Sequence, residues 1–112
     1  KGSQVVKIFN HAAGMTNGIL QVSKNAKYSF SPRNKAHEIW IKGKPLKNDD
    51  EYWVAAPNFV TQGGDGYWEF QNSIEYIDTG VLIVDAAEYF LQDMEVYEPK
   101  YEGRVLVIDS EI

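Results

Sequence analysis

Two stretches of the chain carry apolar residues at intervals of three and four, which is the period of a helix. The first stretch places Val5, Ile8, Phe9 and Ala12 on one face. The second places Val84, Ala87, Leu91 and Met94 on one face. Because an apolar stripe of this kind is buried when a helix packs on a core, the pattern predicts two main helices, each with one face against the core.

Strands are indicated by short runs of apolar, aromatic and β-branched residues that turn formers separate. The runs cover residues 19–23, 26–30, 37–42, 52–56 and 104–109. Lys24 and Asn25 predict a tight turn between the first two runs. The run 52–56 is the richest in strand formers, so we expect a central strand there.

The region between the last two runs predicts less regular structure. Asn58 is expected to cap a short helical turn that ends at Gln62, because asparagine is a favourable residue at the start of a helix. The aromatic stretch 67–77 is expected to form a compact loop packed on the core. No repeat or linker divides the chain, so we expect residues 1–112 to form a single α+β unit in which a mixed or antiparallel sheet packs with two main helices.

Charge and composition narrow the classes of partner. The formal net charge is −5, and the basic residues are scattered rather than clustered. A protein that tracks a nucleic-acid backbone needs a concentrated basic patch, so we expect no nucleic-acid partner. No run of about eighteen apolar residues is present, so we expect no membrane span. The absence of cysteine excludes disulfides, zinc–thiolate sites and cysteine nucleophiles.

The titratable residues do not predict a catalytic or metal centre. His11 and His37 lie far apart in the sequence, with no further histidine or aspartate near either at the spacing of metal ligands. The acidic run 49–51 is most simply a solvated turn, and Asp78 and Asp85 are placed to cap or complement the start of the second helix. We therefore expect structural or surface roles for both histidines, no catalytic residue and no metal ligand in this chain.

One motif could bind a ligand, namely the glycine loop of residues 63–66 with Tyr67 directly after it. Three glycines in four positions allow left-handed backbone conformations, and we expect Gly64 or Gly66 to have a positive φ. Asp65 is expected to hold the turn by accepting hydrogen bonds from neighbouring amides. Tyr67 would then either stack on a flat ligand as a partly exposed ring or pack into the core, and the residues alone favour neither.

The order and spacing of six pieces resemble the C-terminal domain of the 5'-nucleotidase family. The pieces are GKPL at 43–46, YWVA at 52–55, NF at 58–59, GGDGY at 63–67, LQVS at 20–23 and EGRV at 102–105. Together they extend over nearly the whole chain, so the resemblance implies that the chain is the C-terminal part of such a domain.

The resemblance implies a two-domain parent enzyme. In this family an N-terminal metallophosphoesterase domain with two divalent metal ions cleaves the phosphate ester, and the C-terminal domain binds the nucleoside between two aromatic rings. The chain would then be the base-binding portion, not catalytic alone, with a nucleoside or nucleotide and the N-terminal domain as its partners. Family members are commonly periplasmic, secreted or bound at the cell surface.

The same resemblance assigns candidate residues. Tyr67 corresponds to one ring of the aromatic pair, and Ile19 stands where the other ring is expected, so half of the pair is missing. The loop residues Gly63, Gly64, Asp65 and Gly66 would approach the base together with Asn58, and Asn72 is a weaker candidate near the ribose. The alternative is a non-catalytic interaction or structural module that kept the fold without a working base pocket. Ile19 favours this alternative, and the intact loop opposes it.

Overall fold

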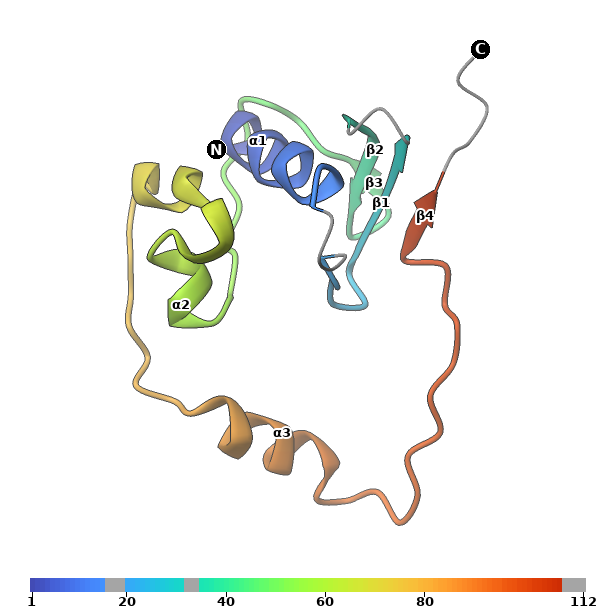
Figure 1. The fold of residues 1–112 in the computed structure, drawn as a ribbon. Helices are drawn as coiled ribbons and strands as arrows, with labels where there is room; N and C mark the ends of the chain where they lie inside the picture. The colour runs from blue at the N-terminus through green and yellow to red at the C-terminus, as the bar shows by residue number, and fades with distance from the viewer. Residues whose placement is uncertain (16–19, 32–34, 108–112) are drawn as a thin grey trace.

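The fold is built on a four-stranded mixed sheet, shown in Figure 1 for the computed structural model, which describes residues 1–15, 20–31 and 35–107. The strands lie in the order β3-β2-β1-β4. Their bounds are Ala26–Ser31 for β1, Lys35–Ile41 for β2, Lys44–Pro45 for β3 and Val105–Val107 for β4. Neighbouring strands are antiparallel except for β1 and β4, which are parallel. The expected α+β class with a mixed sheet is therefore confirmed.

Strands β1, β2 and β4 form where local signals placed them, whereas β3 was not predicted. Ala26 donates a backbone hydrogen bond of 3.0 Å to the Ser23 carbonyl, which closes the predicted turn at Lys24 and Asn25. Tyr28 of β1 pairs with Ile39 of β2 on one side and with Val105 of β4 on the other. The last predicted strand is present at Val105–Val107, and the end of that prediction lies outside the described residues.

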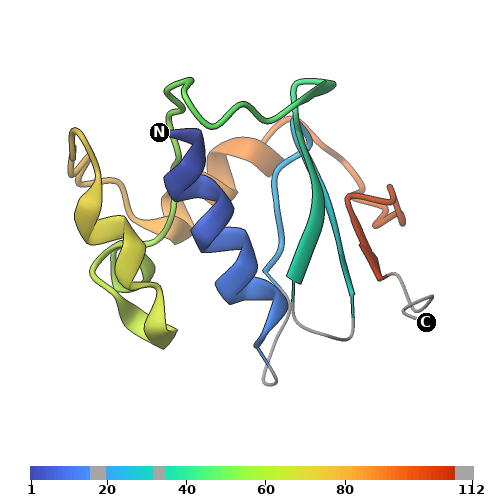
Figure 2. The ribbon, with the colours of Figure 1, turned by 90° about the horizontal axis from the view of Figure 1, so that it is seen from above.

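The first helix, α1 (Gly2–Ala13), lies against the sheet with the predicted face buried (Figure 2). Its buried side chains include Val5, Ile8, Phe9 and Ala12. The Phe9 and Tyr28 rings meet edge to face, with centroids 4.6 Å apart. The core therefore sits between α1 and β1, and it depends on a helix and a hairpin that are neighbours in sequence.

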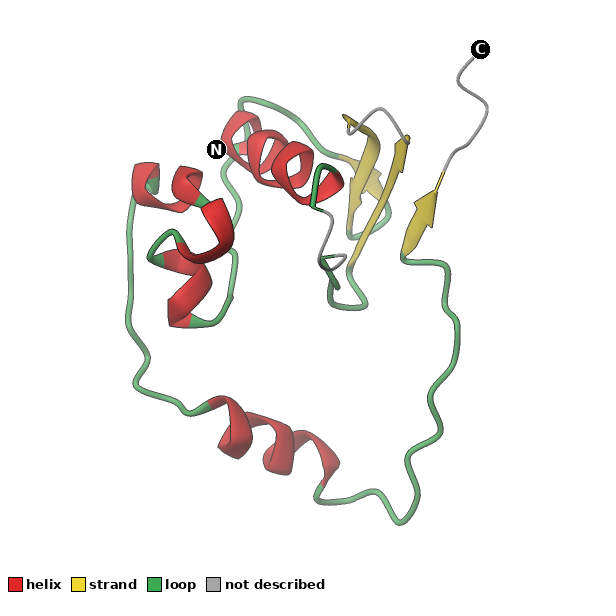
Figure 3. Ribbon diagram, in the orientation of Figure 1, coloured by secondary structure: helices red, strands yellow, loops and turns green. Residues whose placement is uncertain are grey.

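Three short helical pieces cover the other side of α1, so that α1 lies between them and the sheet (Figure 3). They are α2 (Asn58–Thr61), η1 (Gly64–Gly66) and η2 (Trp68–Asn72). The predicted helical turn after Pro57 is confirmed, although Pro57 rather than Asn58 occupies the cap position. Of the stretch 67–77, residues 67 and 70 pack on the core and residues 71–77 are exposed, so the predicted compact loop is only partly right.

Two predicted strands are wrong. Residues 20–23 are not a strand, and the first residue of that run lies outside the described ranges. Residues 52–56 form no strand either, and no ladder of the sheet includes them. Tyr52 packs on the core, where its phenolic oxygen accepts the Lys47 N–H at 3.0 Å, whereas Trp53 is exposed. Strand formers need a neighbouring strand to pair with, and the sheet offers none to this run.

The second predicted helix, α3 (Ile83–Leu91), is confirmed, but its predicted packing is not. Residues 73–102, which we call the arm, are exposed along their whole length. In Figure 1 the arm leaves η2, passes through α3 at a distance from the core and returns to β4. No helix within the described ranges is long and apolar enough to span a membrane.

Candidate functional site

The glycine loop has a left-handed backbone at three of its four positions. The φ angles are 97° at Gly63, 56° at Asp65 and 81° at Gly66. Glycine occupies this region without steric cost, and aspartate tolerates it better than most residues. The expected positive φ is confirmed at Gly66 and is not found at Gly64. The left-handed conformation therefore explains why glycine stands at positions 63 and 66.

Each glycine of the loop also makes room for an aromatic ring of this chain. A Cβ atom on Gly63 would lie 2.5 Å from the Trp68 ring. One on Gly64 would lie 2.5 Å from Cε1 of Phe59, and one on Gly66 would lie 2.8 Å from the His11 ring. These separations are far below van der Waals contact, so no larger residue fits without movement. Three rings thus enclose the loop backbone from different sides.

His11 fastens the loop to α1. Its Nε2 lies 2.7 Å from the Asp65 carbonyl oxygen, and because a carbonyl only accepts hydrogen bonds, Nε2 carries the proton. The His11 ring also meets the Tyr67 ring edge to face, with centroids 4.5 Å apart. The structural role expected for His11 agrees with these contacts, while the His37 side chain lies outside what the structure describes.

The Asp65 carboxylate does not hold the turn, contrary to expectation. Within the described ranges no hydrogen bond reaches this exposed carboxylate, and it is the Asp65 carbonyl that bonds, to His11. The carboxylate still acts on its neighbour through its charge. Burial raises the pKa of the Tyr67 phenol, and the negative charge of Asp65 raises it further.

Tyr67 is buried, with 5% of its surface exposed, so the structure does not show the partly exposed ring of the first alternative. It packs with Ile8 and Ala12 of α1 and with Phe70 of η2. The physical reason is that the apolar face of α1 extends beyond the sheet and needs a cover at this end. Tyr67 therefore belongs to the core in this conformation, which is the second of the two alternatives that the residues left open.

The other candidate residues are brought together only in part. Asn58 begins α2 directly beside the loop, and its side-chain oxygen accepts the Phe59 N–H at 2.9 Å. The Asn72 amide donates to the Glu69 carboxylate at 3.2 Å, within η2. Ile19, which would replace the second ring, lies outside the described residues. The structure thus joins Asn58, the loop and Tyr67 in one place.

Two exposed aromatic residues flank the loop. The sequence did not indicate either of them as a ligand contact. Phe59 is 61% exposed and Trp68 is 64% exposed. A shallow surface depression lies nearby, lined by Thr61, Gln62, Phe70, Gln71, Ser73 and Tyr76. Their positions in the sequence could have indicated them, because both rings lie within a few residues of the glycines that they contact.

The described part of the chain brings no group of three or more His, Asp or Glu side chains together as a metal site would require.

The curated proteins to which the chain is similar include Protein UshA and 5'-nucleotidases. The chain is 31% identical over 107 residues to Protein UshA of Escherichia coli, covering 90% of this chain and 20% of that protein. It is 34% identical over 120 residues to the 5'-nucleotidase of Homo sapiens, covering 94% and 21%. The chain therefore spans about a fifth of the length of these curated relatives.

A solved structure extends the likeness to the whole fold. The crystal structure of the 5'-nucleotidase precursor from Thermus thermophilus matches with a TM-score of 0.87 and 26% identity, over 96% of this chain and 24% of that one. The sequence model described as "5'-nucleotidase, C-terminal domain" matches residues 1–72, well over half of the chain. The chain belongs to the 5'-nucleotidase C-terminal domain family.

Proposed function

We propose that this chain is the nucleoside-binding portion of a metal-dependent 5'-nucleotidase-like phosphohydrolase. The observation that carries the proposal is the glycine loop, fixed in a left-handed conformation between the exposed rings of Phe59 and Trp68 in a chain of this family. A rigid loop beside flat apolar faces suits a purine or pyrimidine, because every base has a face that stacks on an aromatic ring.

The chemistry would reside in an N-terminal metallophosphoesterase domain of the parent protein. Two divalent ions there would polarise the phosphate ester and activate water. The present chain would hold the base at the loop, and binding a remote part of the substrate orients the scissile phosphate. By resemblance to the family, the parent protein would be periplasmic, secreted or bound at the cell surface.

The base would stack on a ring at the loop, and three rings are available. Phe59 and Trp68 already expose a face, whereas Tyr67 would have to leave its contact with His11. The backbone of residues 63–66 and the Asn58 amide would approach the base edge. Ile19 would pack on the opposite face, and Asn72 would lie nearer the ribose.

Titration of the full-length enzyme with adenosine, followed by tryptophan fluorescence, tests the proposal. Alanine at the stacking ring should weaken binding by about 1–3 kcal/mol, the usual size of a base–aromatic stack. The variants Phe59→Ala, Trp68→Ala and Tyr67→Ala are compared with Trp53→Ala, which alters an exposed tryptophan outside the loop. Equal affinity for adenosine in all four variants would contradict a base site at this loop.

A second candidate function is a non-catalytic interaction or structural module. The observation in its favour is the burial of Tyr67, because a ring that is packed in the core does not present a face to a ligand. Its signature would be a folded parent protein that shows no saturable fluorescence change with adenosine and in which Tyr67→Ala lowers only the melting temperature.

A further inference from the structure

The segment 20–23 leads into the turn before β1 and belongs to no strand. Two of its carbonyl groups are hydrogen-bonded to side chains from other parts of the chain. The Leu20 carbonyl accepts the Tyr28 hydroxyl at 2.9 Å, and the Val22 carbonyl accepts an N–H of Arg104, with Nη1 at 3.0 Å. Both bonds are partly buried, where a carbonyl without a donor would destabilise the fold. Side chains therefore fix this segment at alternate residues.

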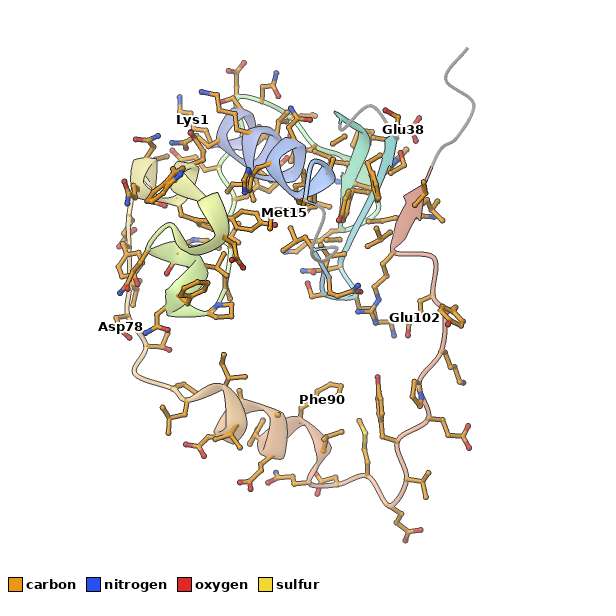
Figure 4. All side chains as sticks on the ribbon, in the orientation of Figure 1. Lys1, Met15, Glu38, Asp78, Phe90 and Glu102 are labelled. Atoms are coloured by element: carbon orange, nitrogen blue, oxygen red, sulfur yellow. The ribbon has the colours of Figure 1, made fainter. Side chains whose placement is uncertain are left out.

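Glu102 orients the guanidinium of Arg104, and Figure 4 shows Glu102 where the arm rejoins the rest of the chain. Nε and Nη2 of Arg104 donate to the same oxygen, Oε2 of Glu102, at 2.8 and 2.5 Å. A guanidinium is planar and its N–H groups point in fixed directions, so fixing two of them also aims Nη1 at Val22. The Arg104 backbone is fixed as well, because its carbonyl accepts the Tyr28 N–H at 2.8 Å.

The segment that Arg104 holds borders the candidate site. Leu20 packs on both parts of the core, the part that contains Tyr28 and the part that contains Tyr67. Val22 packs on the first of these parts. Tyr67 directly follows the glycine loop, so a displacement of the segment would change the packing around the loop. Arg104 is thus connected to the candidate site through the Val22 carbonyl and the Leu20 side chain.

These contacts give a role to the motif EGRV at 102–105, which the glycine loop does not use. Its glutamate and arginine form the pair that holds Val22, and Gly103 between them has a φ of 68°, which glycine adopts without strain. We propose that Arg104 is a positioning residue for the nucleoside site, because its guanidinium holds the Val22 carbonyl and thereby keeps Leu20 packed against the part of the core that contains Tyr67. This inference rests on the proposed function.

A positioning role of this kind acts on base affinity rather than on bond cleavage. The segment borders the site proposed for the base, whereas the phosphate ester would be cleaved in the other domain of the parent enzyme. Without the Arg104 hydrogen bond, part of the binding energy of the base is used to order the segment again. The affinity for the nucleoside then falls, and the turnover of bound substrate does not.

Variants of the full-length enzyme test the proposal through adenosine affinity, the kinetics of adenosine monophosphate hydrolysis and amide hydrogen exchange. Arg104→Ala should raise the adenosine Kd and the KM about tenfold, leave kcat within about twofold and accelerate exchange at residues 20–23. Arg104→Lys keeps one charged donor and should restore part of the affinity. Glu102→Gln should raise the Kd less, by about threefold, because it weakens only the support of Arg104. Leu106→Ala changes an exposed side chain of β4 and is the control.

Two results would overturn the proposal. The first is a lower melting temperature in Arg104→Ala with the adenosine Kd and the KM at wild-type values, which would assign Arg104 to the fold alone. The second is unchanged exchange at residues 20–23, which would show that Arg104 does not hold the segment. If Arg104→Ala fails to fold, Glu102→Gln and Arg104→Lys give the same comparison with a milder change.

Failure of this inference differs from failure of the proposed function. If the wild-type enzyme gives no saturable response to adenosine, the proposed function fails and this inference fails with it. If the wild-type enzyme binds adenosine and alanine at a ring of the loop weakens that binding, but Arg104→Ala does not, only the role of Arg104 is wrong.

Discussion

The two main helices have similar patterns and opposite surroundings. Phe9 on the apolar face of α1 is 6% exposed, whereas Phe90 on the apolar face of α3 is 64% exposed. The difference is that α1 has the β1–β2 hairpin directly after it in sequence, while α3 follows and precedes long extended stretches. The apolar face of a helix therefore indicates which side is suited to burial. It does not indicate whether the segment that would cover that side lies nearby in the sequence.

The largest expected difference between the two helices is in core deletion. Phe9→Ala should destabilise the 112-residue chain by about 3–5 kcal/mol, because it removes a buried ring that contacts Tyr28. Phe90→Ala should change stability by less than about 0.5 kcal/mol in the same chain. Urea unfolding of both variants measures the difference. Similar losses of stability would mean that α3 packs on the core in solution.

Glycines with nearly the same backbone conformation give a second comparison. Gly66 in the loop has φ of 81° and Gly80 in the arm has φ of 70°. Gly66→Ala should cost about 2–4 kcal/mol, since it adds left-handed strain to a clash with His11.

Gly80→Ala serves as the matched control, because a Cβ atom there meets nothing within 4 Å and only the left-handed strain remains. We expect a cost of about 1 kcal/mol from that strain alone. The measurement is the melting temperature of each variant. An equal decrease in both would show that backbone strain alone, rather than the His11 contact, determines the loss of stability in Gly66→Ala.

A polar contact in each region gives a smaller difference. His11→Ala removes the hydrogen bond to Asp65 and the ring contact with Tyr67, at an expected cost of about 1–2 kcal/mol. Asp78→Ala removes the 2.9 Å hydrogen bond to the Gly80 amide in the arm and should cost less than about 0.5 kcal/mol. Amide hydrogen exchange at residues 63–67 should accelerate only in the His11 variant. Unchanged exchange at these residues in the His11 variant would show that His11 does not hold the loop in place.

The smallest expected effect is on alkaline stability. Burial raises the pKa of Tyr28 to about 12, and its hydroxyl donates to the Leu20 carbonyl at 2.9 Å. Because the folded state holds this proton more tightly than the unfolded state, the stabilisation is complete below about pH 10 and is lost as pH rises toward 12. Tyr28→Phe should cost about 1 kcal/mol at neutral pH and reduce the alkaline loss. Tyr101→Phe, at an exposed position of the arm, should leave the pH profile unchanged.

Sequence reasoning succeeded where structure is local. The helical periods, the turn at residues 24–25, and the β1 and β2 strands depend on residues close together in the chain, and all are present. It failed where a distant partner decides the outcome. The run 52–56 has the composition of a strand, yet it pairs with no strand in the described part of the chain.

The candidate site divides in the same way. The positive φ of Gly66 follows from the local motif, since few other residues adopt that conformation. The burial of Tyr67 depends on His11 and Ala12 of α1, more than fifty positions earlier in the chain, and no local pattern encodes that contact. The enclosure of each glycine by a ring could likewise be recognised only from tertiary structure.

The parallel pairing of β1 with β4 has a consequence for how quickly the sheet can form. Tyr28 and Val105, which face each other across this ladder, are far apart in the sequence, with α3 and the rest of the arm between them. The entropy of closing so long a loop must be lost before the three-residue β4 gains any hydrogen bond. During synthesis, α1 and the β1–β2 hairpin can assemble first, and β4 joins them only after the arm has left the ribosome. The slowest step in completing the sheet should therefore be the docking of its last strand.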